Sequence, residues 1–278
     1  MKKVKEPVKA YNNLEFLNSQ DARTIRILSE FYEPQSRFEK HNIIDTIVFF
    51  GSARLLSKRD AKKNLTELKK QKNQYTKSFK TKLKKAEQLL AMSKYYEDAV
   101  ELSKRLTDWS MNLPVDEKRF IVCSGGGPGI MEAANKGAKK AGGHSIGLNI
   151  SIPTEQFANP YIDPEFVFEF HYFFMRKFWF VYLAKALVVF PGGFGTLDEM
   201  MEVLTLSQTD KIKKEMKIVI YDTDYWKQII NFDALIEHGM ISASDMKLFD
   251  FCNTVDEAFN SITSHFTKHY LVNGKKKK

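Results

Sequence analysis

Short apolar runs alternate along the chain with longer segments whose apolar residues recur every three or four positions. Runs of this kind are typical of strands buried on both faces, and the longer segments are typical of helices that bury one face. The predicted strands are residues 43–50, 119–123, 145–150, 166–170, 186–190, 217–221 and 249–252. This alternation predicts an α/β fold, a doubly wound parallel sheet with helices on both faces.

The remaining segments predict three additions to this sheet. Residues 1–40 form an N-terminal extension with one helix, and residues 41–270 form the α/β domain. Inside the domain, residues 57–93 place apolar side chains at alternating three- and four-residue steps among many lysines. This stripe predicts a basic helical insertion, either one long helix or an arm that packs on the body or on another copy. Residues 271–278 form a basic tail.

Capping residues and prolines set the expected helix ends. The first helix starts near residues 19–23 and ends at Pro34, because proline cannot donate a helical hydrogen bond. A very aromatic helix is predicted at residues 171–184. Another is predicted at residues 225–237, with Asp224 as its N-cap.

Three predicted strands run directly into glycine-containing turns. Gly51 and Ser52 follow the first strand, residues 124–129 follow the second, and residues 191–195 follow the fifth and open a helix. Because the carboxyl ends of parallel strands meet at one edge of the sheet, the three turns are expected to share one cleft. A glycine turn before a helix exposes backbone N–H groups at the positive end of the helix dipole, which favours a phosphate. An ordinary strand-to-helix turn is the alternative for each turn taken singly.

Composition and cysteine usage exclude several classes of protein. A chain of 278 residues that is 43% hydrophobic can bury a substantial core, and it has no apolar run of the roughly 20 residues that span a membrane. No secretory signal is visible, and Cys123 and Cys252 lie in apolar strand-like stretches, so we expect buried free thiols and a cytoplasmic location. The histidines are scattered without ligand spacing, so we expect no metal and no cofactor.

The net charge of +9 raises the question of nucleic acid. Much of the excess lies between Lys58 and Lys94 and in the last four residues, without the arginine and aromatic interleaving of a base-stacking surface. We therefore favour a solvated helix face over a nucleic-acid site. The alternative, a contact with nucleic acid or another partner, predicts binding that weakens steeply with salt.

Two segments together resemble the paired signature of the Lonely Guy (LOG) family, whose members are often labelled lysine decarboxylases. They are Phe-Phe-Met-Arg-Lys at residues 173–177 and Pro-Gly-Gly-Phe-Gly-Thr-Leu-Asp-Glu at residues 191–199. The resemblance runs from about Asp45 to Thr205 and beyond, interrupted by the basic insertion. Phe173 and Phe174 stand where shorter members have Met and His, so the chain is similar to the longer-chain branch.

This resemblance implies a Rossmann-like fold and a phosphoribohydrolase that acts on small-molecule nucleoside 5′-monophosphates. Such an enzyme cleaves the N-glycosidic bond of an AMP-like nucleotide to free base and ribose 5-phosphate. The resemblance also implies a homodimer or higher homo-oligomer, for which the aromatic helix is a suitable interface. The alternatives are a non-catalytic nucleotide or molybdenum-cofactor carrier of related fold and, least favoured, a lysine decarboxylase that uses pyridoxal phosphate.

The resemblance implies Arg176 and Glu199 as the catalytic pair. It assigns the phosphate to Gly192, Gly193, Gly195 and Thr196. The other predicted substrate-binding residues are Gly51, Ser52, Gly126, Gly127, Met131, Glu155, Lys177, Asp198 and Thr205. Glu132 is a weaker candidate, and Glu155, Gln156 and Asn159 lie in a loop that could face the base.

The chemistry of the reaction fits these residue types. Breaking an N-glycosidic bond builds positive charge on the ribose, which a carboxylate near C1′ stabilises while it orients or deprotonates water. Glu199 is predicted in the first turn of the helix that begins at the phosphate loop, so bound phosphate would position the ribose beside it. Arg176 could hold phosphate or ribose, or stabilise the charge of Glu199. Taken singly, Glu199 could be an acid favoured by the helix dipole and Arg176 a surface ion-pair residue.

Overall fold

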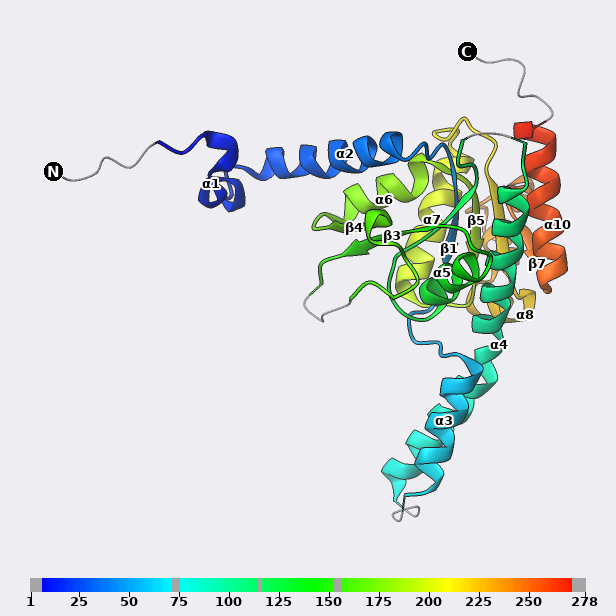
Figure 1. The fold of residues 1–278 in the computed structure, drawn as a ribbon. Helices are drawn as coiled ribbons and strands as arrows, with labels where there is room; N and C mark the ends of the chain where they lie inside the picture. The colour runs from blue at the N-terminus through cyan, green and yellow to red at the C-terminus, as the bar shows by residue number, and fades with distance from the viewer. Residues whose placement is uncertain (1–6, 72–75, 115–116, 153–156, 272–278) are drawn as a thin grey trace.

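The computed structural model describes residues 7–71, 76–114, 117–152 and 157–271. Its centre is a seven-stranded sheet in the order β4-β3-β2-β1-β5-β6-β7 (Figure 1). All neighbouring strands are parallel, which confirms the predicted doubly wound α/β fold. The strands are β1 (Thr46–Phe50), β2 (Ile121–Ser124), β3 (Ser145–Ile150), β4 (Val167–Phe170), β5 (Ala184–Val189), β6 (Lys217–Tyr221) and β7 (Asp250–Cys252).

Two apolar cores form because alternate strand residues point to opposite faces of the sheet. In β1, Ile47 and Phe49 enter one core, and Val48 and Phe50 enter the other. The first core is covered by α5 (Ile130–Lys140), α10 (Val255–Phe266) and the inner part of α4 (Lys77–Met111). The second is covered by α2 (Arg23–Lys40), α6 (Phe173–Tyr182), α7 (Phe194–Gln208), α8 (Thr223–Ile229) and α9 (Phe232–Glu237).

Helix α2 continues through Pro34, so the predicted helix end at this proline is wrong. Proline leaves the carbonyl of residue 30 without its helical donor. In the folded protein the indole N–H of Trp179 donates to the Glu30 carbonyl at 2.9 Å. The Glu30 carboxylate in turn accepts from the backbone N–H groups of His171 and Tyr172, just before α6. A tertiary contact therefore replaces the lost bond, and α2 continues to Lys40. A short helix, α1 (Leu14–Asn18), precedes α2 (Figure 1).

The lysine-rich insertion is an arm of two helices that projects from the sheet domain (Figure 1). It consists of α3 (Lys58–Lys69) and the outer part of α4, which pack against each other. Ser57 caps α3 and Thr76 caps α4, each through a side-chain oxygen. The segment is divided between two helices, so the single long helix is wrong, and packing of the arm on the body or on another copy stays a prediction. Residues 72–75 lie outside the described residues. The described lysines of α3 are exposed while Leu65 and Leu68 are half-buried, which confirms a solvated lysine face.

Other helix ends also differ from the prediction. Helix α6 is shorter than residues 171–184, because β5 begins already at Ala184. Residues 225–237 divide into α8 and α9, since Ile230 is extended and the Asn231 side chain caps a new helix. The N-cap of α8 is Asp222 and not Asp224, because the carboxylate of Asp222 accepts from the N–H of Tyr225 at 2.8 Å.

Cys123 and Cys252 are buried free thiols, as predicted. Within the described ranges no helix is long and apolar enough to cross a membrane. The same ranges contain no group of three or more histidine, cysteine or acidic residues placed to hold a metal ion.

The bond between Trp179 and Glu30 predicts a measurable stability difference. Trp179→Phe removes the indole N–H that bonds to the Glu30 carbonyl in place of the donor missing at Pro34. Trp226→Phe removes an indole N–H that is also buried but has no partner among the described residues. We expect Trp179→Phe to lower the free energy of unfolding by about 1–2 kcal/mol more than Trp226→Phe. Urea denaturation of both variants measures this difference, and equal losses would contradict it.

Candidate functional site

A cavity of 820 Å³ lies at the carboxyl edge of the sheet, where β1 and β5 pair. The chain order of the strands reverses direction here, and such switch points are the usual ligand sites of open α/β sheets. The turns after the two strands are joined by hydrogen bonds. Ser52 N–H donates to the Pro191 carbonyl at 3.0 Å, and Phe190 N–H donates to the Phe50 carbonyl at 2.8 Å. The cavity lining includes Gly51, Gly125 and Gly192, one from each of the three predicted turns, which confirms that these distant turns share one cleft.

Ten predicted site residues line this cavity: Gly51, Ser52, Met131, Arg176, Gly192, Gly193, Gly195, Thr196, Asp198 and Glu199. Four others do not line it: Gly126, Gly127, Lys177 and Thr205. Glu155, with its neighbour Gln156, lies outside the described residues. The roles of all these residues in binding and catalysis remain predictions.

Each of the four displaced residues has another contact. The carbonyls of Gly126 and Gly127 accept hydrogen bonds from the amide of Asn159, so this buried asparagine stabilises the second glycine turn. Lys177 forms ion pairs with Asp198 and Glu202, beside the cavity. Thr205 is exposed and donates to the carbonyl one helical turn earlier. The direct contact with substrate predicted for them therefore finds no support in the lining of the cavity.

Residues 191–196 form a turn that we call the phosphate loop. It leads into α7, whose N-cap Gly193 provides no side-chain cap for the first N–H groups of the helix. These unpaired N–H groups and the helix dipole favour an anion. A Cβ at Gly192 would overlap the Thr196 hydroxyl, so glycine is required there, while the space beside Gly193 and Gly195 is open. The loop thus presents bare backbone to the cavity.

Glu199 is the sixth residue of α7 and lies in its second turn. The predicted first-turn position is wrong, because the helix already begins at Phe194. The side chain is 6% exposed, and its Oε2 atom has no hydrogen-bond partner among the described residues. Burial raises the pKa of Glu199 to about 7, although the positive charges of Arg176 and Lys177 oppose this shift. A buried, unpartnered carboxylate facing a cavity is costly to keep and indicates a ligand-binding role.

Arg176 approaches the same end of the cavity from α6. Its Nε donates to the Leu148 carbonyl at 2.7 Å, and its guanidinium lies so close to Gly125 that a Cβ there would overlap it. Burial lowers the pKa of Arg176, while the charge of Glu199 raises it. Arg176 forms no ion pair within 4 Å among the described residues, so the interpretation as a surface ion-pair residue is wrong. Its guanidinium lies over the ring of Phe180, 4.9 Å from the ring centroid, and Arg176 lines the cavity. Its outer nitrogens have no hydrogen-bond partner among the described residues.

Several lining residues escaped the sequence analysis. Arg54 follows the first glycine turn, and its backbone N–H donates to the Ser52 hydroxyl, which fixes the turn. Tyr225 reaches the cavity from α8. Phe173 and Phe194 are 54% and 92% exposed, although large apolar side chains are usually buried. Two features of the sequence could have indicated these residues. Arg54 lies two residues after Gly51-Ser52, and Phe194 lies between two loop glycines.

Two weaker candidates have structural roles instead. Glu132 lies near the start of α5 after the second glycine turn, but its carboxylate accepts from the Tyr96 hydroxyl on α4. Asn159 is buried and bonded to the glycine turn and to Asn135. Neither side chain lines the cavity.

Comparison with known proteins agrees with the signature at the cavity. A family model described as possible lysine decarboxylase matches residues 131–262. The probable cytokinin riboside 5′-monophosphate phosphoribohydrolase LOG4 of Oryza sativa subsp. japonica is 26% identical over 167 residues, which cover 59% of this chain and 68% of that protein. Cytokinin riboside 5′-monophosphate phosphoribohydrolase LOG3 of Arabidopsis thaliana is 26% identical over 183 residues, or 65% and 80% of the two chains. These matches confirm the predicted resemblance to the LOG family.

The solved structures that resemble this chain have lower sequence identity than these relatives. The molybdenum cofactor binding protein of Rippkaea orientalis has a TM-score of 0.44 and 18% identity, over 61% of this chain and 86% of that one. The molybdenum cofactor carrier protein of Chlamydomonas reinhardtii has a TM-score of 0.41 and 20% identity, over 63% and 89%. At these values the likeness says nothing of the function of this protein.

The raised pKa of Glu199 predicts a pH-dependent stability. The folded pKa of about 7 exceeds the ordinary value of 4.5, so the folded state binds more protons between these pH values and loses stability as pH rises through them. Relative to Glu199→Gln, wild type is expected to lose on the order of 3 kcal/mol of unfolding free energy between about pH 4 and pH 8. Urea denaturation of both proteins across this range measures the loss. A difference that does not change with pH would contradict the shifted pKa.

Proposed function

We propose that the protein is a phosphoribohydrolase that cleaves the N-glycosidic bond of nucleoside 5′-monophosphates to free base and ribose 5-phosphate. The observation that carries this proposal is the buried carboxylate of Glu199, which has no hydrogen-bond partner in the described chain and lines the same cavity as the uncapped phosphate loop. Two relatives named as cytokinin riboside 5′-monophosphate phosphoribohydrolases support the same reaction class.

The loop and the helix together position the substrate. The 5′-phosphate binds the N–H groups at the start of α7, where the backbone is uncapped and the helix dipole is positive. Arg54 lines the same cavity, and its side chain has no protein partner among the described residues, so it adds a cation for the phosphate. Because Glu199 lies on the helix that binds the phosphate, the ribose is held beside its carboxylate.

Glu199 then acts on the glycosidic carbon. As the bond to the base breaks, positive charge develops on the ribose, and the ionised carboxylate stabilises it. A pKa of about 7 leaves Glu199 able to accept a proton from the attacking water near neutral pH. The outer nitrogens of Arg176 lie at the same end of the cavity and bind ribose or phosphate oxygens.

The base occupies the apolar part of the cavity beside Arg176. Met131, Ile150 and Phe173 line this part, and they come from the β2, β3 and β4 side of the sheet. All three side chains are apolar, and the flat ring of Phe173 can stack on a purine ring. We therefore propose AMP or a related purine nucleotide as the substrate. The relatives' names also give a riboside 5′-monophosphate as the substrate.

Loss of the carboxylate is the sharpest test of this reaction. Glu199→Gln keeps the shape of the side chain, and we expect release of adenine from AMP to fall at least about a hundredfold. Glu132→Gln is the matched control, because Glu132 also follows a glycine turn at a helix start but bonds to Tyr96 away from the cavity. Chromatography of free base from a panel of nucleosides, monophosphates and triphosphates measures activity and selectivity.

The outcomes separate the proposal from its alternative. Selective cleavage of monophosphates, lost in Glu199→Gln and retained in Glu132→Gln, supports the hydrolase. Tight binding of a monophosphate by the folded wild type without release of base would contradict it and favour a carrier of related fold.

We also propose that the protein forms a homodimer through α6. Four aromatic side chains of this helix, Phe173, Phe174, Phe178 and Tyr182, are 54%, 52%, 36% and 55% exposed. A contiguous aromatic face of this kind is typical of an interface. We expect sedimentation velocity to give a dimer at micromolar concentration, and Phe178→Asp to shift it toward monomer. A monomeric wild type would contradict this interface.

A further inference from the structure

The phosphate loop has a side-chain support that comes from α8. The hydroxyl of Tyr225 donates a hydrogen bond to the carbonyl of Gly192 at 2.8 Å, and Tyr225 also lines the cavity. Gly192 has no side chain, and its carbonyl lies just before the N-terminus that would bind the phosphate. The position of Tyr225 therefore influences where the free N–H groups of the loop point.

Asp222 fixes the start of the helix that carries Tyr225. It directly follows β6, and its carboxylate Oδ1 accepts from the backbone N–H of Tyr225 at 2.8 Å. The residue has φ of +75° and ψ of 93°, a conformation that non-glycine residues rarely adopt. Strained backbone of this kind persists where surrounding contacts hold it, and it is concentrated at functional sites.

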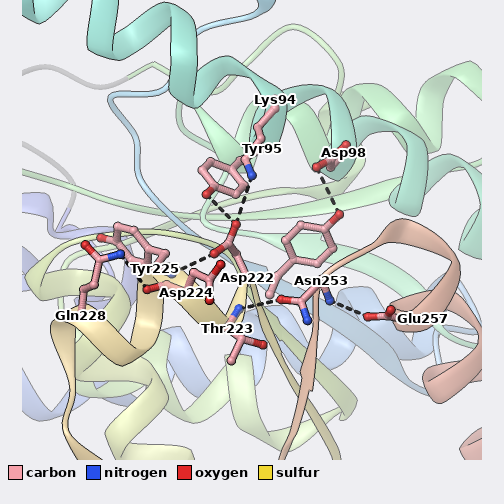
Figure 2. A network of polar contacts seen from close by, with 11 residues as sticks. Lys94, Tyr95, Asp98, Asp222, Thr223, Asp224, Tyr225, Gln228, Asn253 and Glu257 are labelled. Carbon is pink, nitrogen blue, oxygen red and sulfur yellow. Dashed lines mark hydrogen bonds and ion pairs between the residues drawn. The ribbon is translucent and has the colours of Figure 1, made fainter.

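The contacts that hold Asp222 come from the base of the helical arm (Figure 2). The Tyr95 hydroxyl donates to Oδ2 of Asp222 at 2.7 Å, and Lys94 Nζ lies 3.2 Å from the same oxygen. Both residues are on α4, where this helix leaves the sheet domain for the arm. Behind Asp222, the side chain of Asn253 accepts from the N–H of Thr223 at 2.9 Å.

The charge of Asp222 is maintained by the same groups. Burial alone would raise its pKa, but the bonds from Tyr95, from the Tyr225 backbone and from Lys94 hold the pKa below its ordinary value. An ionised carboxylate accepts stronger hydrogen bonds than a neutral one. The link from α4 through Asp222 to α8 is therefore made of charge-assisted bonds.

We propose that Asp222 is a positioning residue for phosphate binding, which fixes Tyr225 against the Gly192 carbonyl and ties the phosphate loop to the base of the lysine-rich arm. This inference rests on the proposed function, because it concerns the loop assigned to the phosphate. This role would connect the inner end of the insertion to the site. Helix α4 also reaches the site directly, because Met92 lines the cavity.

The first variants remove single hydroxyl groups. Tyr225→Phe is expected to raise the KM for AMP about two- to tenfold with kcat nearly unchanged, because the loop binds phosphate and does not perform the chemistry. Tyr95→Phe is expected to raise KM in the same direction. The double variant is expected to raise KM by less than the product of the two single effects, because Tyr95 reaches the loop through Asp222 and Tyr225.

The matched control is Tyr221→Phe. The Tyr221 hydroxyl donates to Asp98 at 3.1 Å in the neighbouring part of the same network, without a bond to Asp222 or the loop. It is expected to leave KM unchanged even where it lowers stability. Substitution of Asp222 itself gives a rescue test. Asp222→Ala is expected to raise KM, and Asp222→Asn is expected to restore part of the loss, since asparagine tolerates positive φ and its oxygen can cap α8 but it lacks the charge that Tyr95 and Lys94 bind.

A binding measurement separates this inference from the proposed function. Each tyrosine substitution is combined with the inactive Glu199→Gln, and the Kd for AMP is measured by calorimetry. Wild-type cleavage of AMP with equal KM for Tyr225→Phe and Tyr221→Phe would overturn the positioning role and leave the hydrolase standing. Binding of AMP without cleavage would overturn the hydrolase, while the Kd of the tyrosine variants still tests the positioning role. No binding of AMP by wild type would overturn both.

Discussion

The parallel pairing of β1 with β5 is the interaction on which the candidate site depends. These strands are separated by more than a hundred residues of sequence, yet their following turns are joined by the bonds from Ser52 to Pro191 and from Phe190 to Phe50. Because both turns are held to each other and to the sheet, the backbone N–H groups at the start of α7 face the cavity in a fixed direction. A site made of backbone groups requires this rigidity, since it has few side chains that could adjust.

Glu199 shows the cost of such a site. A carboxylate that is buried without a hydrogen bond destabilises the folded protein, and at neutral pH this cost is greater than at acid pH. Nearby Arg176 and Lys177 reduce the cost, but Arg176 is engaged at Leu148 and Lys177 pairs with Asp198 and Glu202. The arrangement is poor for stability and suitable for a group that must stabilise charge on a ligand.

Both additions to the sheet are connected to the site by specific polar contacts. The N-terminal helix α2 presents Glu30 to the start of α6, the helix that holds Arg176. The arm presents Tyr95 to Asp222, whose helix contacts the phosphate loop through Tyr225. Glu30 and Asp222 each place a carboxylate at a helix start, where the first backbone N–H groups have no helical acceptor. The added segments thereby help to set the directions of α6 and α8.

The sequence by itself determined the sheet, its parallel strands and the glycine turns at one edge, because hydrophobic periodicity and glycine positions are local properties. It also indicated Arg176 and Glu199, through their resemblance to a family signature. The ends of the helices became clear from contacts in the folded chain. The Trp179 bond lets α2 continue past Pro34, and Asp222, which Tyr95 holds in place, caps α8 instead of Asp224. The tertiary structure also decided that Lys177 and Thr205 lie off the cavity while Arg54 and Tyr225 line it. Trp179 and the Tyr95 hydroxyl that holds Asp222 each bond to a residue more than a hundred positions away, and the cavity lining depends on how distant segments pack. No local pattern contains this information.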